Sequence, residues 1–280
     1  MTFITRFAPS PTGPLHLGHA YSAMLAHDRA QAEGGTFLLR IDDLDQSRAR
    51  DPWEAQIYDD LAWMGLTWET PVRRQSDHFA DYDATLHRLS EMGLTYACTC
   101  TRRDIEAAAN APQEGVPQFG PDGRIYPGTC RKTGHASSDA KCIRLDMRAA
   151  CEKALPVHFE ESGPDHTGTH VLDLGTMVST VGDVVLARPN MAASYHLSVV
   201  LDDAATEVTD VIRGADLFEA TAIHVVLQKL LGLPTPRYHH HKLIRDENGK
   251  RLAKRDDARA IAKYRAEGTS PADIRAMVGL

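Results

Sequence analysis

The sequence predicts an α/β protein built around a parallel sheet, because its N-terminal part alternates between strand and helix signals. Residues 3–8 form a short apolar run typical of a buried strand. A helical pattern begins at Leu17 and continues to Ala32, where Gly34 and Gly35 end it. Residues 36–41 form a second strand pattern. Two strands joined through a helix make a βαβ unit, and such units build parallel sheets.

Length and composition fit an ordinary globular protein. The 280 residues suffice for one large α/β domain with an insertion, or for two small domains. Hydrophobic residues make up 42% of the chain and charged residues 25%, as in soluble proteins. No apolar run approaches the roughly 20 residues that span a bilayer, and the N-terminus has no signal-peptide pattern. We therefore expect a cytoplasmic protein without a membrane partner.

Four further helices are predicted from apolar spacing. They cover residues 52–64, 81–92, 217–231 and 272–278, and the last follows the capping pair Ser270-Pro271. The net charge of −7 argues mildly against a protein whose whole surface binds nucleic acid. A local basic groove stays compatible with that charge, because acidic and basic residues can be segregated.

An insertion is expected in the middle of the chain. Between Thr101 and Ser138, Gly, Pro, Asn and Cys become frequent and the apolar periodicity fades. Residues 171–187 and 195–212 are rich in Val and Ile, so we predict strands there. The five cysteines are an odd number, which argues against a disulfide framework in a cytoplasmic chain.

The strongest local signal is TGPLHLGH, at Thr12–His19, between the first strand and the first helix. A helix N-terminus presents unpaired N–H groups and a positive dipole end, which favour phosphate. Gly18 has no side chain, so a flat adenine base can approach the backbone. His16 and His19 can donate hydrogen bonds to phosphate oxygens as negative charge develops. Two unrelated histidines at a helix start are the alternative, and the strand-to-helix context weighs against it.

A Gly-led cationic segment, GKRLAKR, lies far along the chain at Gly249–Arg255. A reaction that expels pyrophosphate needs mobile positive charge against the β- and γ-phosphates. Lys suits that task, because it carries a compact charge on a flexible stem. Taken in isolation, the segment is better explained as an exposed basic turn.

Together, these motifs resemble the signatures of class I aminoacyl-tRNA synthetases. RFAPSPTGPLHLGH resembles their HIGH signature, and GKRLAKR is similar to their KMSKS loop. LLRIDDLD, SYHLSVVLDD and VIRGADLFEAT are similar to the glutamyl branch. The resemblance implies a Rossmann-like catalytic domain with a parallel sheet that activates an amino acid with ATP and Mg²⁺. It assigns His16, Gly18, His19 and Lys254 to ATP, and a KMSKS-like loop to Arg251, Leu252, Ala253, Lys254 and Arg255.

Two features narrow the resemblance to the glutamyl-queuosine tRNA(Asp) synthetases. The chain ends soon after the KMSKS-like loop, so we expect no anticodon-binding domain, and its cysteine pattern is similar to that subfamily. The resemblance implies that glutamate is activated without tRNA and is transferred to the queuosine base at the wobble position of tRNA(Asp). We expect a monomer with a discontinuous catalytic domain (residues 1–95 and 186–255), an inserted zinc-containing subdomain (96–185) and a short helical remnant that contacts the RNA stem (256–280).

The residues also predict a glutamate pocket, which needs cations for two carboxylates and an acid for the ammonium group. Arg6, at the end of the first strand, and Arg213 supply the cations, because a planar guanidinium binds carboxylate through two parallel bonds. Asp42, at the end of the second strand, supplies the acid. For Arg213 alone, a structural salt bridge is an equally good interpretation. The resemblance assigns the same pocket to Arg6, Phe7, Ala8, Pro9, Ser10, Asp42, Tyr195 and Arg213.

A zinc site is expected in the insertion. Cys98, Cys100 and Cys130 are soft ligands that suit Zn²⁺, and a closed structural site needs a fourth ligand. Chemistry alone favours His or Cys over a phenol, which has to lose a proton with a pKa near 10. The resemblance favours Tyr126, and three buried thiols without metal are the alternative. The candidates for the fourth ligand are therefore Tyr126, His135 and Cys142.

Departures from the family pattern keep other hypotheses open. Arg251 and Ala253 replace a Lys and a Ser of the KMSKS loop, while Lys254 is kept, so adenylation could be slower. The alternatives are a minimal glutamyl-tRNA synthetase, a nucleotidyltransferase with a similar TGxxHxGH motif, and a catalytically silent synthetase-like module that binds RNA or a protein partner. We interpret the tract His239–His241 as part of a surface that faces RNA or nucleotide.

Overall fold

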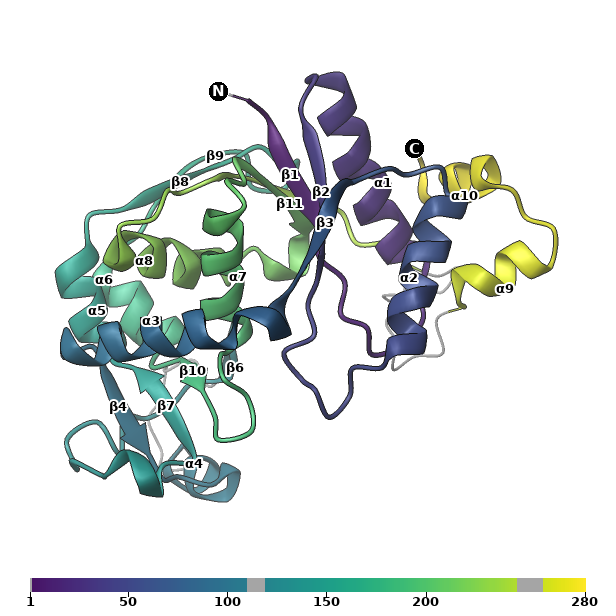
Figure 1. The fold of residues 1–280 in the computed structure, drawn as a ribbon. Helices are drawn as coiled ribbons and strands as arrows, with labels where there is room; N and C mark the ends of the chain where they lie inside the picture. The colour runs from purple at the N-terminus through teal and green to yellow at the C-terminus, as the bar shows by residue number, and fades with distance from the viewer. Residues whose placement is uncertain (1, 110–118, 246–258) are drawn as a thin grey trace.

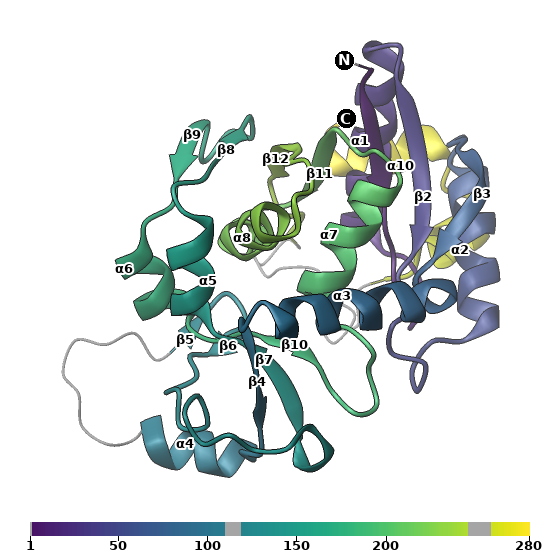
Figure 2. The same cartoon turned by 60° about the vertical axis from the view of Figure 1, so that its left-hand side comes forward.

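The computed structural model describes residues 2–109, 119–245 and 259–280 (Figure 1). The KMSKS-like loop with Lys254 lies outside the described residues. In Figures 1 and 2, a sheet that carries β1 and β2 stands beside a helical half with α7 and α8, and β4 and β7 project from the lower end of that half.

The predicted βαβ unit is present and parallel. Strand β1 (Ile4–Phe7) leads through α1 (Leu17–Ala32) into β2 (Thr36–Ile41), and β3 (Glu69–Arg74) completes the order β1-β2-β3. Both strand pairs in this sheet are parallel. The fold class inferred from the sequence, an α/β protein with a parallel sheet, is therefore confirmed.

A second sheet runs beside β1. Strand β11 (Asp210–Gly214) pairs in parallel with β12 (Arg237–His241), which pairs in parallel with β8 (His158–Glu161), and β9 (Gly168–Val171) is antiparallel to β8. The backbone N–H of Thr209 donates to the carbonyl of Ile4 at 2.9 Å, which holds β11 alongside β1. The chain order thus reverses between β1 and β11, and ligands of open α/β sheets bind at such a switch point.

The segment with the predicted zinc ligands forms a separate antiparallel sheet. Its order is β10 (Val185–Ala187), β7 (Cys142–Leu145), β4 (Thr95–Cys98), and a small hairpin pairs β5 (Phe119–Gly120) with β6 (Gly123–Arg124). Strands β8 and β9 fall inside the expected insertion but join the sheet with β12. The domain boundaries at residues 95 and 185 therefore stay predictions.

The helices at 52–64, 81–92, 217–231 and 272–278 are confirmed, with ends that differ by a few residues. Helices α4, α5 and α6 are additional to the predicted ones, and α9 lies within the helical remnant expected at 256–280. The helical elements are α2 (Asp51–Trp63), η1 (Gln75–His78), α3 (Phe79–Glu91), α4 (Arg102–Ala109), η2 (Ser137–Asp139), α5 (Met147–Ala154), α6 (Leu174–Thr176), η3 (Met177–Val181), α7 (Tyr195–Ala205), η4 (Ala215–Leu217), α8 (Thr221–Leu231), α9 (Ile261–Ala266) and α10 (Pro271–Val278).

The prediction of strands over 171–187 and 195–212 is largely wrong. Helix α7 occupies Tyr195–Ala205, where the Ser194 hydroxyl caps its first turn by accepting from the N–H of Leu197 at 3.5 Å. Most side chains of α7 are buried, so its apolar residues do not alternate with exposed ones in a helical pattern. A short buried apolar run cannot be assigned to strand or helix from periodicity alone.

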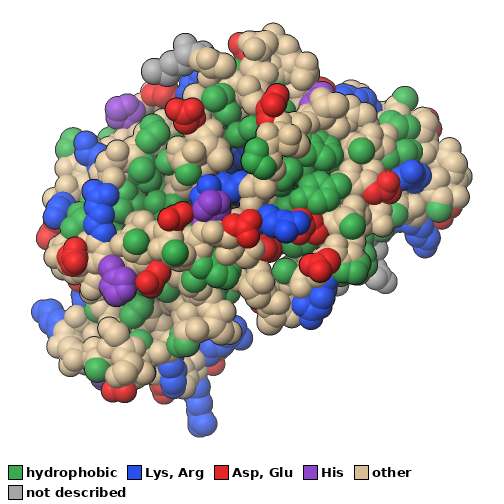
Figure 3. Space-filling model, viewed as in Figure 1, with side chains coloured by type: hydrophobic (Ala, Val, Ile, Leu, Met, Phe, Trp, Pro, Cys, Tyr) green, Lys and Arg blue, Asp and Glu red, His purple; other side chains and the backbone are tan. Residues whose placement is uncertain are grey.

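Two large apolar clusters form most of the core, and a third, smaller one surrounds Cys98, Tyr126 and Cys130. Of the two large clusters, one packs α1, α2 and β2 around Met24, Ile41 and Leu61, and the other packs α5, α7 and α8 around Leu197 and Leu227. On the face shown in Figure 3, acidic and basic side chains are intermixed. Within the described ranges, no helix is long and apolar enough to cross a membrane.

Candidate active site

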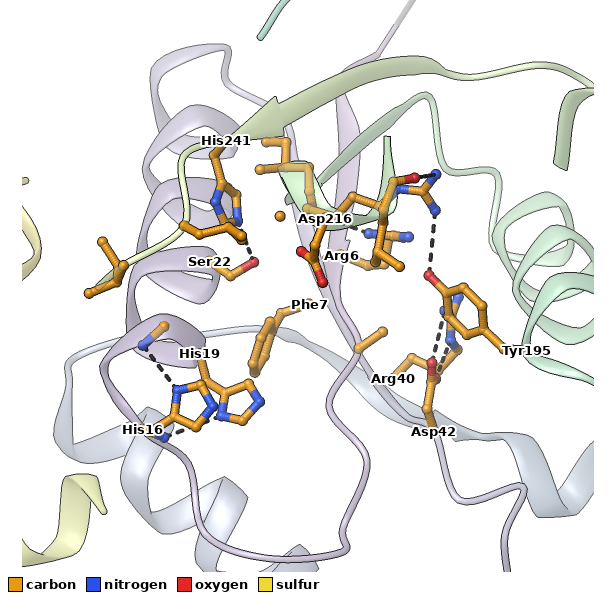
Figure 4. Close-up of a pocket in the computed structure, with 18 residues that line it drawn as sticks. Arg6, Phe7, His16, His19, Ser22, Arg40, Asp42, Tyr195, Asp216 and His241 are labelled. Atoms are coloured by element: carbon orange, nitrogen blue, oxygen red, sulfur yellow. Dashed lines mark hydrogen bonds and ion pairs between the residues drawn. The ribbon is translucent and has the colours of Figure 1, made fainter. Parts of the chain in front are cut away.

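A cavity of about 360 Å³ lies at the carboxyl ends of β1, β2 and β11, beside the N-terminus of α1 (Figure 4). It brings together most of the predicted ATP and glutamate residues. Pro9 and Ser10 are not among its lining residues, whereas Ser22 and Arg40 line it without having been predicted. The predicted residues that line it are Arg6, Phe7, Ala8, His16, Gly18, His19, Asp42, Tyr195 and Arg213.

His16 and His19 build the start of α1. His16 is the N-cap residue, and its Nδ1 accepts from the N–H of Gly18 at 3.1 Å. The N–H of His16 in turn donates to Nδ1 of His19 at 3.2 Å, and the two rings stack at 3.8 Å between centroids. Because both rings accept at Nδ1, each neutral ring carries its hydrogen on Nε2. That tautomer presents a donor for an anion at the helix N-terminus.

Gly18 is required by the packing of this turn. A Cβ atom at Gly18 would lie 3.0 Å from Cε1 of the His16 ring, closer than such atoms normally approach. The glycine therefore lets the His16 ring fold back over the helix start. This reason adds to the access for a nucleotide base expected from the sequence.

The described residues on both sides of the KMSKS-like loop lie at this cavity. Leu243 and Ile244 line it before the loop. After the loop, Ala260 forms a β-bridge with His16, and the N–H of Ile261 donates to the carbonyl of Leu15 at 2.9 Å. The chain that enters and leaves the loop is therefore fixed to the same helix start that holds His16 and His19.

Arg6 is paired with an acid that the sequence analysis did not identify. Its Nε and Nη2 donate to the two carboxylate oxygens of Asp203 at 2.9 and 3.2 Å, and Nη1 donates to the carbonyl of Ile212 at 3.4 Å. Nη1 of Arg40 donates to Asp203 at 2.5 Å, and Nε of Arg40 donates to Asp42 at 2.7 Å. We call Arg6, Arg40, Asp42, Asp202 and Asp203 the balanced network, because each buried cation in it contacts a carboxylate.

The pKa values in the balanced network follow from burial and pairing. Burial opposes ionisation of Asp203, but the adjacent guanidinium groups of Arg6 and Arg40 outweigh it and hold the pKa below its usual value. At Asp42, burial wins against Arg40 and raises the pKa to about 6. Asp202 connects the network to neighbouring side chains: it accepts from the Tyr82 hydroxyl at 2.8 Å and from the Gln75 amide nitrogen at 2.8 Å.

Arg213 lies in a different electrostatic environment. Its side chain is buried, with the residue only 6% exposed, yet within residues 2–109, 119–245 and 259–280 no carboxylate forms an ion pair with it. The structural salt bridge considered for Arg213 is therefore not observed among these residues. Its neutral partners are His240 Nε2 (3.0 Å), His224 Nδ1 (3.1 Å), the Tyr195 hydroxyl (3.4 Å), the Leu217 carbonyl (3.2 Å) and the Thr221 hydroxyl (2.8 Å).

Two residues of the tract His239–His241, which the sequence analysis interprets as part of a surface that faces RNA or nucleotide, are buried in the structure. His240 is 2% exposed and His241 is 5% exposed. His241 lines the cavity, where its Nε2 lies 2.9 Å from the Ser22 hydroxyl. Both belong to β12, whose alternating side chains are buried in this part of the protein on both faces. Consecutive polar residues in a strand buried on two faces look like a solvated segment in the sequence.

A thiol cluster lies away from this cavity, at the end of β4. The Sγ atoms of Cys98, Cys100 and Cys130 all lie within 4.8 Å of one another, and the group could hold a metal ion. The Sγ atoms of Cys100 and Cys130 are 3.4 Å apart. In a tetrahedral zinc site with Zn–S bonds of 2.3 Å, sulfur atoms are separated by about 3.8 Å. The three thiols therefore have a spacing close to that of a metal site.

Tyr126 is placed at the open side of the three thiols. Its hydroxyl lies 3.4 Å from the Sγ of Cys98 and 3.4 Å from the Sγ of Cys100, and it accepts from the N–H of Cys130 at 2.9 Å. Burial opposes ionisation of Cys130, but hydrogen bonds from Tyr126 and neighbouring groups lower the pKa of its thiol to about 6, whereas burial raises the pKa of the Cys100 thiol to about 11. The chemistry of this donor set fits a soft divalent metal.

The other two candidates for a fourth ligand are arranged differently. Nε2 of His135 lies 3.3 Å from the Thr99 hydroxyl, and the His135 side chain is exposed. Cys142 is the strand partner of Cys98 in the β4–β7 pair. Neither is in the group of three thiols that meets the metal-site distance criterion in the described chain. Tyr126 is the candidate whose donor atom is in contact with two of the thiols.

The fold and the cavity define a class of protein: an α/β enzyme that binds an anionic ligand at a helix start beside a pocket for a charged substrate. Comparisons narrow this class. Residues 2–280 match the family of class I tRNA synthetases (E and Q), catalytic domain. The chain therefore belongs to that family, and it is a ligase of the aminoacyl-tRNA synthetase type.

Individual relatives agree with this assignment. A protein of Rhodobacter capsulatus named glutamyl-Q tRNA(Asp) synthetase is 63% identical over 99% of this chain and 100% of its own length. A protein of the same name from Nocardia farcinica is 41% identical over 98% of this chain and 82% of its own. The resemblance to this subfamily, expected from the motifs, is confirmed.

Solved structures show the same catalytic fold. A glutamate tRNA ligase from Elizabethkingia meningosepticum, solved with its amino acid, has a TM-score of 0.75 and 25% identity. The match covers 99% of this chain and 60% of that protein, so this chain spans less than two thirds of its length. A methionyl-tRNA synthetase of Mycobacterium tuberculosis, at 11% identity and a TM-score of 0.59, shares the fold alone.

Proposed function

We propose that this enzyme activates L-glutamate with ATP and transfers it to the queuosine base at the wobble position of tRNA(Asp). The observation that carries the proposal is Arg213, a buried cation at the cavity whose contacts in the described chain are neutral. A buried charge without an opposite charge is costly. A carboxylate of glutamate would supply that charge, beside the Tyr195 hydroxyl as a further donor.

Asp42 would receive the ammonium group of glutamate. It lies at the end of β2 and lines the same cavity as Arg213. Its pKa of about 6, raised by burial, leaves it ionised at neutral pH. Nε and Nη2 of Arg40 donate to the two oxygens of this carboxylate at 2.7 and 3.4 Å, so Arg40 would hold it in place at the cavity.

The start of α1 would bind the phosphates of ATP. His16 and His19 each carry a hydrogen on Nε2 when neutral, so they can donate to the α-phosphate as negative charge develops. The glutamate carboxylate would attack the α-phosphorus in line, and pyrophosphate would leave. Mg²⁺ enters with ATP as part of the substrate. Lys254, outside the described residues, would neutralise the leaving phosphates; Ala260, six positions further along the chain, forms a β-bridge with His16.

The second step joins the activated glutamate to RNA. A hydroxyl group of queuosine would attack the acyl carbon of the adenylate and expel AMP. The rate gain would come from holding the two reactants in contact, and we assign no general base from the protein. The name of the Rhodobacter capsulatus relative supports this acceptor, because that protein is called a glutamyl-Q tRNA(Asp) synthetase.

We also propose one structural zinc ion, held by Cys98, Cys100, Cys130 and Tyr126. The contacts of the Tyr126 hydroxyl with two thiols support it as the fourth ligand over His135 and Cys142. The ion would fix β4 to the loop that carries Cys130, in a region with few apolar residues. Zinc closed by four ligands in this way stabilises a fold and does not enter the reaction.

The test is transfer of radiolabelled glutamate, with ATP, to three RNAs: tRNA(Asp) with queuosine, tRNA(Asp) without it, and tRNA(Glu). The proposal expects label on the queuosine-containing tRNA(Asp) alone. Label on tRNA(Glu) would instead identify a minimal glutamyl-tRNA synthetase. No label, together with no glutamate-dependent pyrophosphate exchange, would leave a silent binding module.

A matched pair of variants sharpens the assay. Arg213→Met should strongly reduce both pyrophosphate exchange and transfer at a glutamate concentration near the wild-type KM. Arg237→Met is the control, because Arg237 lies on the neighbouring strand β12 but pairs with Asp210 at the surface. If both variants lost activity equally, the assignment of the glutamate carboxylate to Arg213 would be wrong.

A further inference from the structure

Two chains of hydrogen bonds extend from Arg213 into the protein, away from the cavity. In the first, Nε of Arg213 donates to Nε2 of His240 at 3.0 Å, and Nδ1 of the same ring contacts Oε2 of Glu161. Both His240 and Glu161 are buried. Glu161 also accepts from the backbone N–H groups of His240 at 2.9 Å and Gly163 at 2.5 Å. This chain therefore ends on a carboxylate held by three donors.

The second chain has two histidines. Nη1 of Arg213 donates to Nδ1 of His224 at 3.1 Å, and Nε2 of His224 lies 3.1 Å from Nδ1 of His196. Nε2 of His196 lies 3.2 Å from Oδ1 of Asp122, in the turn between β5 and β6. The second chain thus connects the pocket to the hairpin of the inserted segment, and it also ends on a carboxylate.

The chemistry of the guanidinium group fixes the hydrogens along both chains. Arginine can only donate, so the ring nitrogen next to it in each chain has to be unprotonated. His240 then carries its hydrogen on Nδ1 and donates to Glu161. His224 carries its hydrogen on Nε2 and donates to His196, whose own Nε2 hydrogen goes to Asp122. All three rings are neutral in this arrangement, and burial supports this by lowering the pKa of His224 and of His240.

We propose that Glu161 and Asp122 are positioning residues that orient Arg213 for the substrate carboxylate through these histidines. They fix each ring as an acceptor toward Arg213 without themselves contacting the guanidinium. The negative charge is thereby kept one or two rings away, and Arg213 stays available to an anion in the cavity. This inference rests on the proposed binding of glutamate at Arg213.

Glu161→Gln is the informative substitution, because it reverses the donor pattern at Nδ1 of His240 and removes the buried charge while it keeps the size of the side chain. The amide oxygen would be held by the N–H groups of His240 and Gly163, which leaves the NH₂ group against Nδ1 of His240. His240 would then have to accept at Nδ1 and carry its hydrogen on Nε2. That hydrogen would face the Nε–H of Arg213, so two donors would oppose each other and the hydrogen bond between them would be lost. We expect the KM for glutamate in pyrophosphate exchange to rise about tenfold, with the KM for ATP unchanged.

Glu160→Gln is the matched control. Glu160 is the adjacent residue of β8, it is exposed, and its carboxylate accepts from the Thr169 hydroxyl at 2.7 Å. The same substitution there should leave both KM values unchanged. A folded Glu161→Gln variant with an unchanged KM for glutamate would overturn the inference.

The hydrogen positions give a second measurement that needs no variant. In ¹⁵N-labelled wild-type protein, long-range ¹H–¹⁵N spectra should show His240 protonated on Nδ1 and His224 on Nε2. The opposite tautomers, or doubly protonated rings at pH 7, would overturn the inference even if Glu161→Gln does not fold. If the wild type is active and Glu161→Gln has an unchanged KM for glutamate, only this inference is wrong. If the wild type shows no glutamate-dependent pyrophosphate exchange, the proposed function is wrong as well.

Discussion

Two buried arginine sites flank the same cavity, and they differ in what offsets the energetic cost of burying a cation. In the balanced network, Arg6 and Arg40 contact the carboxylates of Asp203 and Asp42 directly. At the second site, Arg213 is surrounded by neutral acceptors, and the acid in its nearer chain, Glu161, lies behind a histidine. The first arrangement is complete within the protein, whereas the second is completed by an anionic ligand.

The difference separates structural from substrate-binding arginines. Removing one partner of a buried ion pair is strongly destabilising, because it leaves the other charge uncompensated. Removing a buried cation that has no paired acid relieves such a cost. Stability and glutamate binding should therefore respond in opposite ways to substitutions at the two sites.

The largest expected effect on stability comes from Asp203→Asn. Both Arg6 and Arg40 would lose their shared countercharge in a buried site, and we expect the free energy of unfolding to fall by about 3–5 kcal/mol. Urea denaturation followed by circular dichroism measures it. Asp210→Asn is the control, because its pair with the exposed Arg237 should contribute at most about 1 kcal/mol. Equal losses of unfolding free energy in the two variants would contradict the role of Asp203 as the shared countercharge of Arg6 and Arg40.

The next effect is on binding, at Arg213. Arg213→Met should raise the KM for glutamate roughly 100-fold, because a charge-assisted contact with a carboxylate is lost. The free energy of unfolding should be unchanged or higher, since a buried cation that has no acid partner among the described residues is replaced by an apolar side chain of similar length. Pyrophosphate exchange and urea denaturation on the same preparation test both parts. A loss of stability like that of Asp203→Asn would show that Arg213 is a structural residue.

A smaller effect is expected from pH, through Asp42. Its pKa is raised by burial to about 6, above the ordinary value of an unfolded Asp. The stability that the protonated carboxyl contributes is therefore present below pH 3.8 and is lost as the pH rises through about 6. Binding of the substrate ammonium needs the ionised form, so the KM for glutamate should rise about tenfold per pH unit below 6.

Asp42→Asn tests the role of Asp42 in this pH dependence, and Glu161 provides a contrast. The Asn variant should show a higher KM for glutamate and no such pH dependence. The pKa of Glu161 is shifted in the opposite direction from that of Asp42. Burial opposes its ionisation, but hydrogen bonds from His240 and Gly163 outweigh burial and lower the pKa to about 2. The stability from Glu161 is thus present above pH 4.5 and is lost only as the pH falls toward 2. A pH profile of the KM that is flat between 5 and 7 would exclude Asp42 from ammonium binding.

Much of the fold could be predicted because its signals are local. The βαβ unit from β1 to β2 follows from strand and helix patterns ended by glycines, and the helix start at His16 follows from the motif TGPLHLGH. Helix α7 was mistaken for a strand, because it is buried on most sides and lacks the alternation that distinguishes the two. Local patterns predict elements best when one face of the element stays in water.

The partners of the site residues could not be predicted in the same way. Arg40 and Asp203 both lie in strings that resemble the glutamyl branch, LLRIDDLD and SYHLSVVLDD. Their contact joins residues 163 positions apart, one at the end of β2 and the other in α7. His240 was assigned to a surface, because a polar residue in a strand buried on two faces has no distinguishing local pattern. The sequence thus identified most residues that line the cavity, whereas the ion-pair partner of each residue could be identified only from the structure.

The smallest expected effect on the cavity comes from the thiol cluster. Cys98→Ser should remove bound zinc, measured by elemental analysis, and lower the midpoint of thermal unfolding, because β4 loses its link to the loop with Cys130. Cys151→Ser is the control, since Cys151 is buried in α5, outside the group of thiols at metal-site distances. The KM for glutamate should change less than about twofold in the zinc-free variant at a temperature where it stays folded, because the cluster lines neither arginine site.

A large rise in that KM would mean that the inserted segment controls the pocket. The hairpin between β5 and β6 offers a route, because its turn carries Asp122, which contacts His196 and through it His224. Asp122→Leu should itself raise this KM in a protein that keeps its zinc, because Asp122 is proposed to position Arg213, and the rise in Cys98→Ser should then resemble it. If Cys98→Ser raised the KM while Asp122→Leu did not, the effect would have to travel through the packing of β10 against β7 and not through the histidines.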